Sequence, residues 1–191
     1  EKPMTTDVSE AIALRNASKQ SPCFFAVNNT ASWRTQAVTA RRWVRDDQLI
    51  GKVEHVACAM HSPLLWLFDD PANVGWTRPT GSMRGNGFAW GQLSHLFAWV
   101  LQCTGLRPVD VACSMVFSPN SGADMHDAAV FSCENGASIS LTGTGAVPGN
   151  AHGDDSDESH PHSGKHVSVR VFGDAGSLVY EGDDQDPSSG D

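Results

Sequence analysis

The chain has 191 residues, 40% of them hydrophobic, and a formal net charge of −9 at pH 7. This length and apolar content suffice for one buried core, so the composition predicts a single folded domain. The acidic balance argues against a nucleic-acid partner, which needs a clustered basic surface, and no run approaches the roughly 18 to 20 apolar residues of a membrane span.

The five cysteines are odd in number, widely spaced and include no C-x-x-C pair. Each lies in an apolar run, which is typical of reduced thiols in a core rather than of disulfides or a metal site. We therefore expect a cytoplasmic protein with these cysteines buried: Cys23, Cys58, Cys103, Cys113 and Cys133.

The first third of the chain predicts two helices and two strands. Asp7, with Glu10 three residues later, is typical of a helix start, and the apolar spacing continues to about Lys19. The nearly all-apolar run Pro22–Val27 predicts a buried strand. A second helix is predicted over Trp33–Val44 and a second strand over Lys52–Met60.

The middle of the chain combines an irregular segment with a buried helix. Residues His61–Gly87 are rich in Pro, Gly and Trp, and a loop of that length is usually functional or disordered. Phe88–Thr104 is apolar nearly all the way round, which indicates a buried helix, and Gly105 marks its end.

The rest of the chain predicts antiparallel strands. Asn135-Gly136 is a strong hairpin signal, and the segments around it alternate apolar and polar residues. The strands expected are 109–117, 124–134, 137–142, 167–171 and 177–180. The fold class predicted is α+β, an open and mainly antiparallel sheet with helices packed on one face.

The segment Gly149–His166 is acidic and carries four histidines, but their spacing fits no standard zinc pattern, so we expect a flexible inserted loop and no metal. The glycines Gly143 and Gly145 follow a strand without a following glycine-bearing helix, so they are no dinucleotide fingerprint.

His95 is the candidate that the sequence itself offers for chemistry. An ionisable ring in so apolar a helix is either hydrogen-bonded to a carbonyl group as part of the core or placed for function, and the spacing leaves both open. Gly91 lies one turn earlier on the same face, and Gln92 and Ser94 add polar groups nearby.

The order of motifs resembles the glucose-fructose oxidoreductase/inositol dehydrogenase (GFO/IDH/MocA) family. The chain shows E-K-P, a capped helix, L-I-G-K-V, a Trp/Gly-rich loop, a helix with an internal histidine and a β-meander ending V-x-V-F-G-D-A-G-S-L. The resemblance implies that residues 1–191 are the C-terminal substrate and oligomerisation domain, truncated at both ends. It also implies an N-terminal Rossmann domain, absent here, that binds NAD or NADP.

The resemblance also implies site roles. Lys2 would bind or deprotonate the substrate hydroxyl beside the nicotinamide, with Glu1 and Pro3 also at the cofactor, and His95 would face the substrate. The family usually has an aspartate four residues before the histidine, where this chain has Gly91. The remaining substrate-facing candidates are Trp76, Arg78, Gly91 and Gln92.

Three functions follow as alternatives. The first is an NAD(P)-dependent oxidoreductase of a sugar, polyol or related hydroxyl or carbonyl compound, with the fragment alone inactive. The second is a non-catalytic binding or regulatory member, which the missing carboxylate at Gly91 favours. The third is a domain that mainly forms a homo-oligomer through the open sheet face, although Ser138, Ser140 and Thr142 make that face polar.

Overall fold

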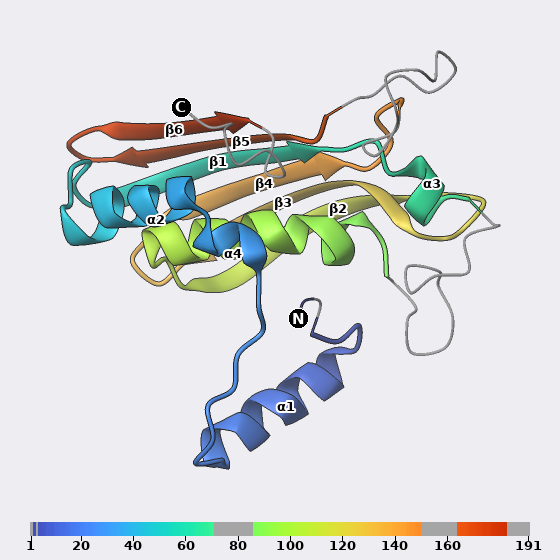
Figure 1. Cartoon of the computed structure of the whole chain (residues 1–191), viewed down its shortest axis with the longest axis horizontal. Helices are drawn as coiled ribbons and strands as arrows, with labels where there is room; N and C mark the ends of the chain where they lie inside the picture. Colours follow the sequence, from blue (N-terminus) through green and yellow to red (C-terminus); the bar gives the residue numbers. More distant parts are fainter. Residues whose placement is uncertain (1, 3, 71–85, 150–163, 183–191) are drawn as a thin grey trace.

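The computed structural model describes residues 2, 4–70, 86–149 and 164–182. One six-stranded sheet organises these residues, with helices against one of its faces (Figure 1). The predicted loop 149–166 and the predicted substrate-facing residues Trp76 and Arg78 fall largely or wholly outside the described residues.

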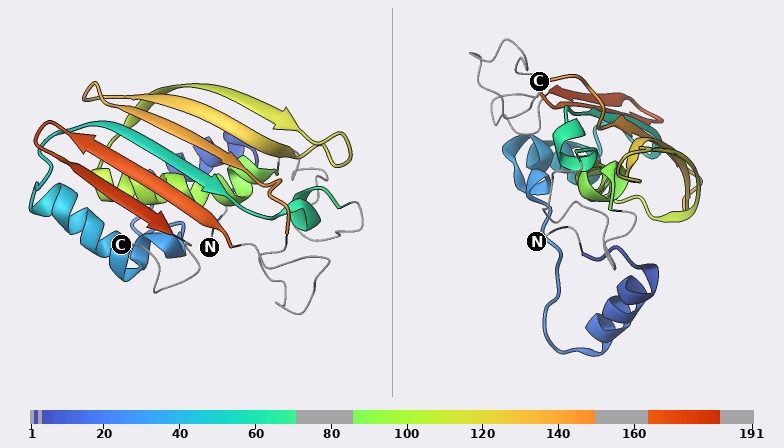
Figure 2. Two further views of the ribbon diagram at one scale, coloured as in Figure 1. Left: turned by 90° about the horizontal axis from the view of Figure 1, so that it is seen from above. Right: turned by 90° about the vertical axis from the view of Figure 1, so that its right-hand side faces the viewer.

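The strand order is β2-β3-β4-β1-β5-β6, so the first strand of the chain lies inside the sheet. β1 pairs parallel with β4 and antiparallel with β5, and every other pair is antiparallel (Figure 2). The predicted α+β class with an open, mainly antiparallel sheet is confirmed. The strands are β1 (Val53–His61), β2 (Pro108–Phe117), β3 (Asp124–Cys133), β4 (Ser138–Thr144), β5 (His166–Gly173) and β6 (Ser177–Gly182).

The helical segments fall into two groups. Those that cover the sheet or its end are η1 (Thr30–Trp33), α2 (Thr35–Arg41), η2 (Arg42–Asp46), α3 (Leu65–Phe68), η4 (Ala89–Leu93) and α4 (Ser94–Thr104). By contrast, α1 (Val8–Gln20) projects away from the body and buries none of its residues (Figure 1). The predicted start of α1 is present, since the Asp7 side chain accepts a hydrogen bond from the Glu10 amide. The predicted end of α4 is present as well, since Gly105 closes that helix at φ +71°.

The sheet has an apolar face and a polar face because side chains alternate along each strand. Val56, Cys58 and Met60 of β1 point to the helices and are buried with Val100 and Trp99 of α4. The opposite face carries Ser138, Ser140 and Thr142 of β4, as the alternation predicts.

The predicted strand Pro22–Val27 is wrong. These residues form a link between α1 and η1 without regular structure, and Phe24 is 94% exposed. An apolar run becomes a strand only where another strand offers hydrogen bonds, and none lies beside this segment among the described residues.

The prediction that every cysteine is buried is also wrong in part. Cys23 in this link and Cys113 on the edge strand β2 are exposed, whereas Cys58, Cys103 and Cys133 are buried. Burial raises the pKa of the Cys58 thiol to about 12, which keeps that thiol protonated and inert.

None of the helices in the described residues is long and apolar enough to cross a membrane.

Candidate functional site

Lys2 and Gly91, which the resemblance places in one site, are in contact. The Lys2 ammonium donates a hydrogen bond to the Gly91 carbonyl oxygen, and the Lys2 amide donates to the Asn28 carbonyl at 3.1 Å. The start of the chain is therefore held against the helical stack formed by η4 and α4. This contact joins residues 89 positions apart, which no local pattern could have shown.

The turn that carries Gly91 is a π-helical turn, η4, that runs directly into α4. Widened turns of this kind are frequent at functional sites. Gly91 is buried, and the half-buried Gln92 accepts a hydrogen bond from the ammonium of Lys165 at 3.1 Å. Lys165 is only 4% exposed, so a second cation is held at the same turn.

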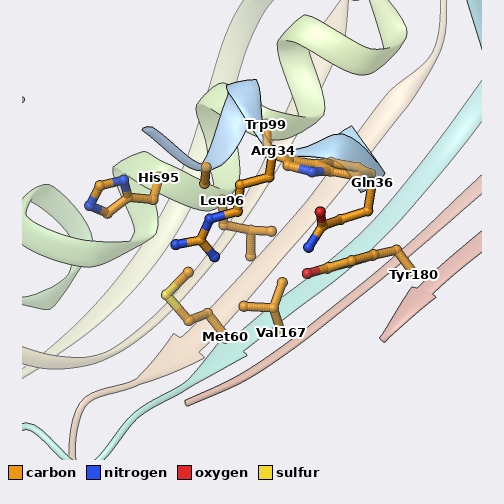
Figure 3. Close-up of a pocket in the computed structure, with 9 residues that line it drawn as sticks. Arg34, Gln36, Met60, His95, Leu96, Trp99, Val167 and Tyr180 are labelled. Atoms are coloured by element: carbon orange, nitrogen blue, oxygen red, sulfur yellow. The ribbon is translucent and has the colours of Figure 1, made fainter. Parts of the chain in front are cut away.

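His95 follows one turn later and lines a small cavity between α4, η1, α2 and the sheet. The cavity measures about 10 Å³, room for about one water. Its other polar lining groups come from Arg34, Gln36 and Tyr180, and Figure 3 shows the Arg34 guanidinium lying between His95 and Gln36.

Arg34 brings a positive charge to the lining of this cavity. One terminal nitrogen of Arg34, Nη1, is buried without a hydrogen-bond partner in the described residues. No aspartate or glutamate belongs to the described lining of the cavity. A buried guanidinium remains charged, so a ligand group placed against it has to be an acceptor or an anion.

Lys2 and His95 have the side-chain chemistry that proton transfer needs. An amine and an imidazole can each take or give a proton; Lys2 lies against η4, and His95 lies on α4 one turn later. No carboxylate accompanies them at position 91: the Lys2 ammonium is bound by a backbone carbonyl instead. Such a carbonyl can orient the amine, but it cannot exchange a proton.

The predicted residues divide into those the structure brings together and those it does not describe. Lys2, Gly91, Gln92 and His95 lie on or against η4 and α4. The residues Glu1, Pro3, Trp76 and Arg78 lie outside the described residues, so their predicted roles remain predictions.

Sequence reasoning missed Arg34, Gln36, Lys165 and Tyr180. One signal was available for Arg34, because it occupies the N-cap of α2, where the helix dipole disfavours a cation. Lys165 gave no signal, since it reaches Gln92 only through the path of the chain into β5.

Comparison with known families decides the affiliation. The family described as GFO/IDH/MocA C-terminal domain matches residues 37–179. The chain belongs to the GFO/IDH/MocA family.

Solved structures share the GFO/IDH/MocA fold at low sequence identity. An oxidoreductase domain protein from Kribbella flavida is 20% identical at a TM-score of 0.71, with 100% of this chain and 52% of that chain covered. A myo-inositol 2-dehydrogenase from Lactobacillus plantarum is 18% identical at a TM-score of 0.66, and the match covers 93% of this chain and 48% of that chain. GenD2 of gentamicin A biosynthesis, solved in complex with NAD, is 16% identical at a TM-score of 0.66, and the match covers 93% of this chain and 44% of that chain.

The chain thus spans about half the length of these solved relatives. A comparison with the curated proteins finds no match. Within the part of the chain that the structure describes, no group of three or more His, Cys, Asp or Glu side chains could hold a metal ion.

Proposed function

We propose that this GFO/IDH/MocA domain forms the substrate side of an NAD(P)-dependent oxidoreductase that acts on a sugar, polyol or related hydroxyl or carbonyl compound. The observation that carries the proposal is the contact of Lys2 with Gly91, one helical turn before His95. The NAD in the GenD2 structure and the inositol dehydrogenase among the relatives support the same reaction class.

In this proposal NAD or NADP accepts or supplies the hydride, and the chain's own residues bind the substrate and move its proton. Lys2 binds the reacting oxygen, and it takes the hydroxyl proton as the alcohol is oxidised only after its own ammonium has given a proton to the solvent. His95 exchanges protons with the same site. A cofactor-contacting role for Glu1 and Pro3, which lie outside the described residues, belongs to the same proposal.

The described residues suit the substrate end of such a site and not the phosphates of the dinucleotide. A Cβ added at Gly143 would meet the Leu93 side chain at 2.7 Å and the Met60 carbonyl oxygen at 2.7 Å. This glycine therefore serves close packing under η4 rather than a phosphate. We propose that a separate dinucleotide-binding domain holds the cofactor, with residues 1–191 as the substrate and oligomerisation domain.

The cations around His95 favour a substrate with an acidic group. Lys2, Lys165 and Arg34 reach the same two helical turns from three distant parts of the chain. The cavity beside His95 holds only about one water, so the body of a substrate lies outside it. We therefore favour a sugar acid over the matching neutral polyol.

A second candidate function rests on Gly91. Without a carboxylate at that position the domain could keep the fold and bind ligands without catalysing their turnover. The Lys2 contact with the Gly91 carbonyl speaks for the oxidoreductase, because it still orients an amine toward the site.

The test is a turnover assay with the protein that includes the dinucleotide-binding domain. Reduced nicotinamide is followed by its absorbance, with NAD and NADP each offered against pairs of a polyol or aldose and the corresponding acid. We expect the cofactor to be reduced, and we expect the acid of a pair to have a lower KM than its neutral partner. If the protein binds the cofactor but turns over neither substrate of any pair, the oxidoreductase proposal is wrong and the non-catalytic function takes its place.

A further inference from the structure

A second cavity lies on the other side of the helical stack, between η4 and α4 and the strands β2, β3 and β4. It measures about 350 Å³, within the size range of sites for small organic ligands. Its lining is mostly apolar, with side chains such as Leu93, Phe97 and Met115. It shares none of the nine described residues that line the small cavity at His95. We call this cavity the β2–β4 groove.

One carboxyl group, that of Asp127, lines this apolar groove. Asp127 is 7% exposed, and neither of its oxygens accepts a hydrogen bond from an N–H or hydroxyl group in the described residues. Its polar neighbour is the carboxyl of Asp124. Burial, reinforced by the charge of Asp124, raises the pKa of Asp127 to about 8.

The two aspartates share a face because of a β-bulge. The ladder between β2 and β3 passes from His126 to Asp124 and skips Met125, so residues three apart point the same way. Asp124 has a structural task, since it accepts a hydrogen bond at 2.6 Å from the Ala89 amide at the start of η4. Asp127 accepts no such hydrogen bond from the part of the chain that the structure describes.

Two further features of the groove suit an organic cation. The Ser94 hydroxyl oxygen is buried without a hydrogen-bond partner in the described residues and lines the same space. The rings of Phe97 and Phe131 stack with centroids 4.5 Å apart and form part of the wall. No lysine, arginine or histidine occurs in the described lining that could satisfy Asp127 from within the chain.

We propose that the β2–β4 groove binds a small organic ammonium ion with an apolar body. The ammonium donates hydrogen bonds to the Asp127 carboxylate and the Ser94 hydroxyl oxygen, and the apolar body lies against the Phe97–Phe131 pair. This site is separate from the one around His95 and does not depend on the oxidoreductase proposal.

The proposal implies that binding releases a proton. The ligand remains an ammonium ion, while the Asp127 carboxyl group releases its proton to the solvent. Affinity should therefore rise with pH, by up to about tenfold per unit between pH 6 and 8. The titratable groups that face Asp127 are Asp124 on its own strand and the Cys113 thiol on β2; η4, α4 and β4 add none to the described lining.

The test compares phenethylamine with phenethyl alcohol, which has the same body without the charge, by calorimetric titration at pH 6, 7 and 8. The amine should bind at least tenfold more tightly than the alcohol. Asp127→Asn should lower the affinity for the amine at least tenfold and remove its pH dependence. Asp110→Asn, which removes an exposed carboxylate of β2, is the matched control for non-specific attraction to the acidic surface.

Thiol labelling gives a second readout that needs no Asp127 variant. Cys23 and Cys113 are the exposed thiols of the described residues, so in a Cys23→Ser background the labelling rate reports on Cys113, which lines the groove. Phenethylamine should slow labelling of Cys113. Equal affinity of the amine for Asp127→Asn and Asp110→Asn, no affinity at millimolar amine, or unprotected Cys113 would each overturn the proposal.

Discussion

Asp127 should control how the stability of the domain depends on pH. Its pKa is raised from 3.8 toward about 8 in the folded chain, so the folded state holds this proton more tightly than the unfolded state does. The free energy of unfolding should therefore fall as the pH rises through this range. The Asp127→Asn variant, neutral and equal in size, should lose this slope and be more stable at pH 8 by about 2 kcal/mol.

Urea unfolding of the chain at pH 5, 6, 7 and 8 measures this effect. The variant Asp110→Asn removes an exposed carboxylate and should keep the pH dependence of the wild type. Parallel slopes for Asp127→Asn and the wild type would contradict the assignment of the buried proton to Asp127.

Single residues were predictable from the sequence where their neighbours made them exceptional. His95 is an ionisable ring in an apolar helix, and Gly91 lies on its face, so both could be selected in advance. The pairing of Asp127 with Asp124 could not be predicted, because the β-bulge that brings the two onto one face depends on the pairing of β3 with β2. Lys165 reaches the site through a tertiary contact alone, and the one signal for Arg34, its place at the N-cap of α2, does not show that it lines the cavity beside His95.

The start of η4 depends on the close approach of Gly87 to β3. A Cβ at Gly87 would lie 2.0 Å from a carboxylate oxygen of Asp124 and 2.5 Å from its backbone nitrogen, so the strand itself would have to move. Gly87→Ala should therefore break the Ala89–Asp124 hydrogen bond and lower the free energy of unfolding by roughly 2 to 3 kcal/mol.

Gly176→Ala is the matched control for this substitution. Its new Cβ would meet only ordinary contacts, the nearest at 3.6 Å from the Ile50 side chain. Chemical denaturation of both variants gives the comparison. A Gly87→Ala protein as stable as Gly176→Ala would show that η4 tolerates displacement from Asp124.

Helices and strands were predictable to the degree that their signals were local. The predicted helix Phe88–Thr104 corresponds to η4 and α4, since an all-round apolar pattern and Gly105 are read directly from the chain. The hairpin at Asn135-Gly136 is likewise present, with Gly136 at φ +87°. The position of β1 between β4 and β5 was not predictable, because parallel pairing joins strands far apart in the sequence.

The polar, open face of the sheet is where we propose that two copies of the whole molecule associate. Val130 of β3 lies on this face and is 52% exposed, whereas Val38 of α2 lies among the helices and is 50% exposed. A buried charge at an interface is costly, so Val130→Arg should shift a dimer to monomers by at least tenfold in Kd.

Sedimentation equilibrium of the two arginine variants measures this association. Val38→Arg, the same change at similar exposure on another surface, should sediment as the wild type does. A wild-type monomer at all concentrations, or equal dissociation of both variants, would contradict association through this face.

The role of Lys2 is the central claim for the protein as an enzyme, and one comparison tests it most directly. Lys2→Met and the control Lys19→Met, a change on the exposed helix α1, are made in the protein that includes the dinucleotide-binding domain. Turnover and NADH or NADPH binding by tryptophan fluorescence are then measured on both. We predict that Lys2→Met lowers kcat at least 1,000-fold, because it removes the proton acceptor, and leaves cofactor affinity within about threefold, because the dinucleotide-binding domain holds most of the cofactor. Full turnover by Lys2→Met would contradict the account.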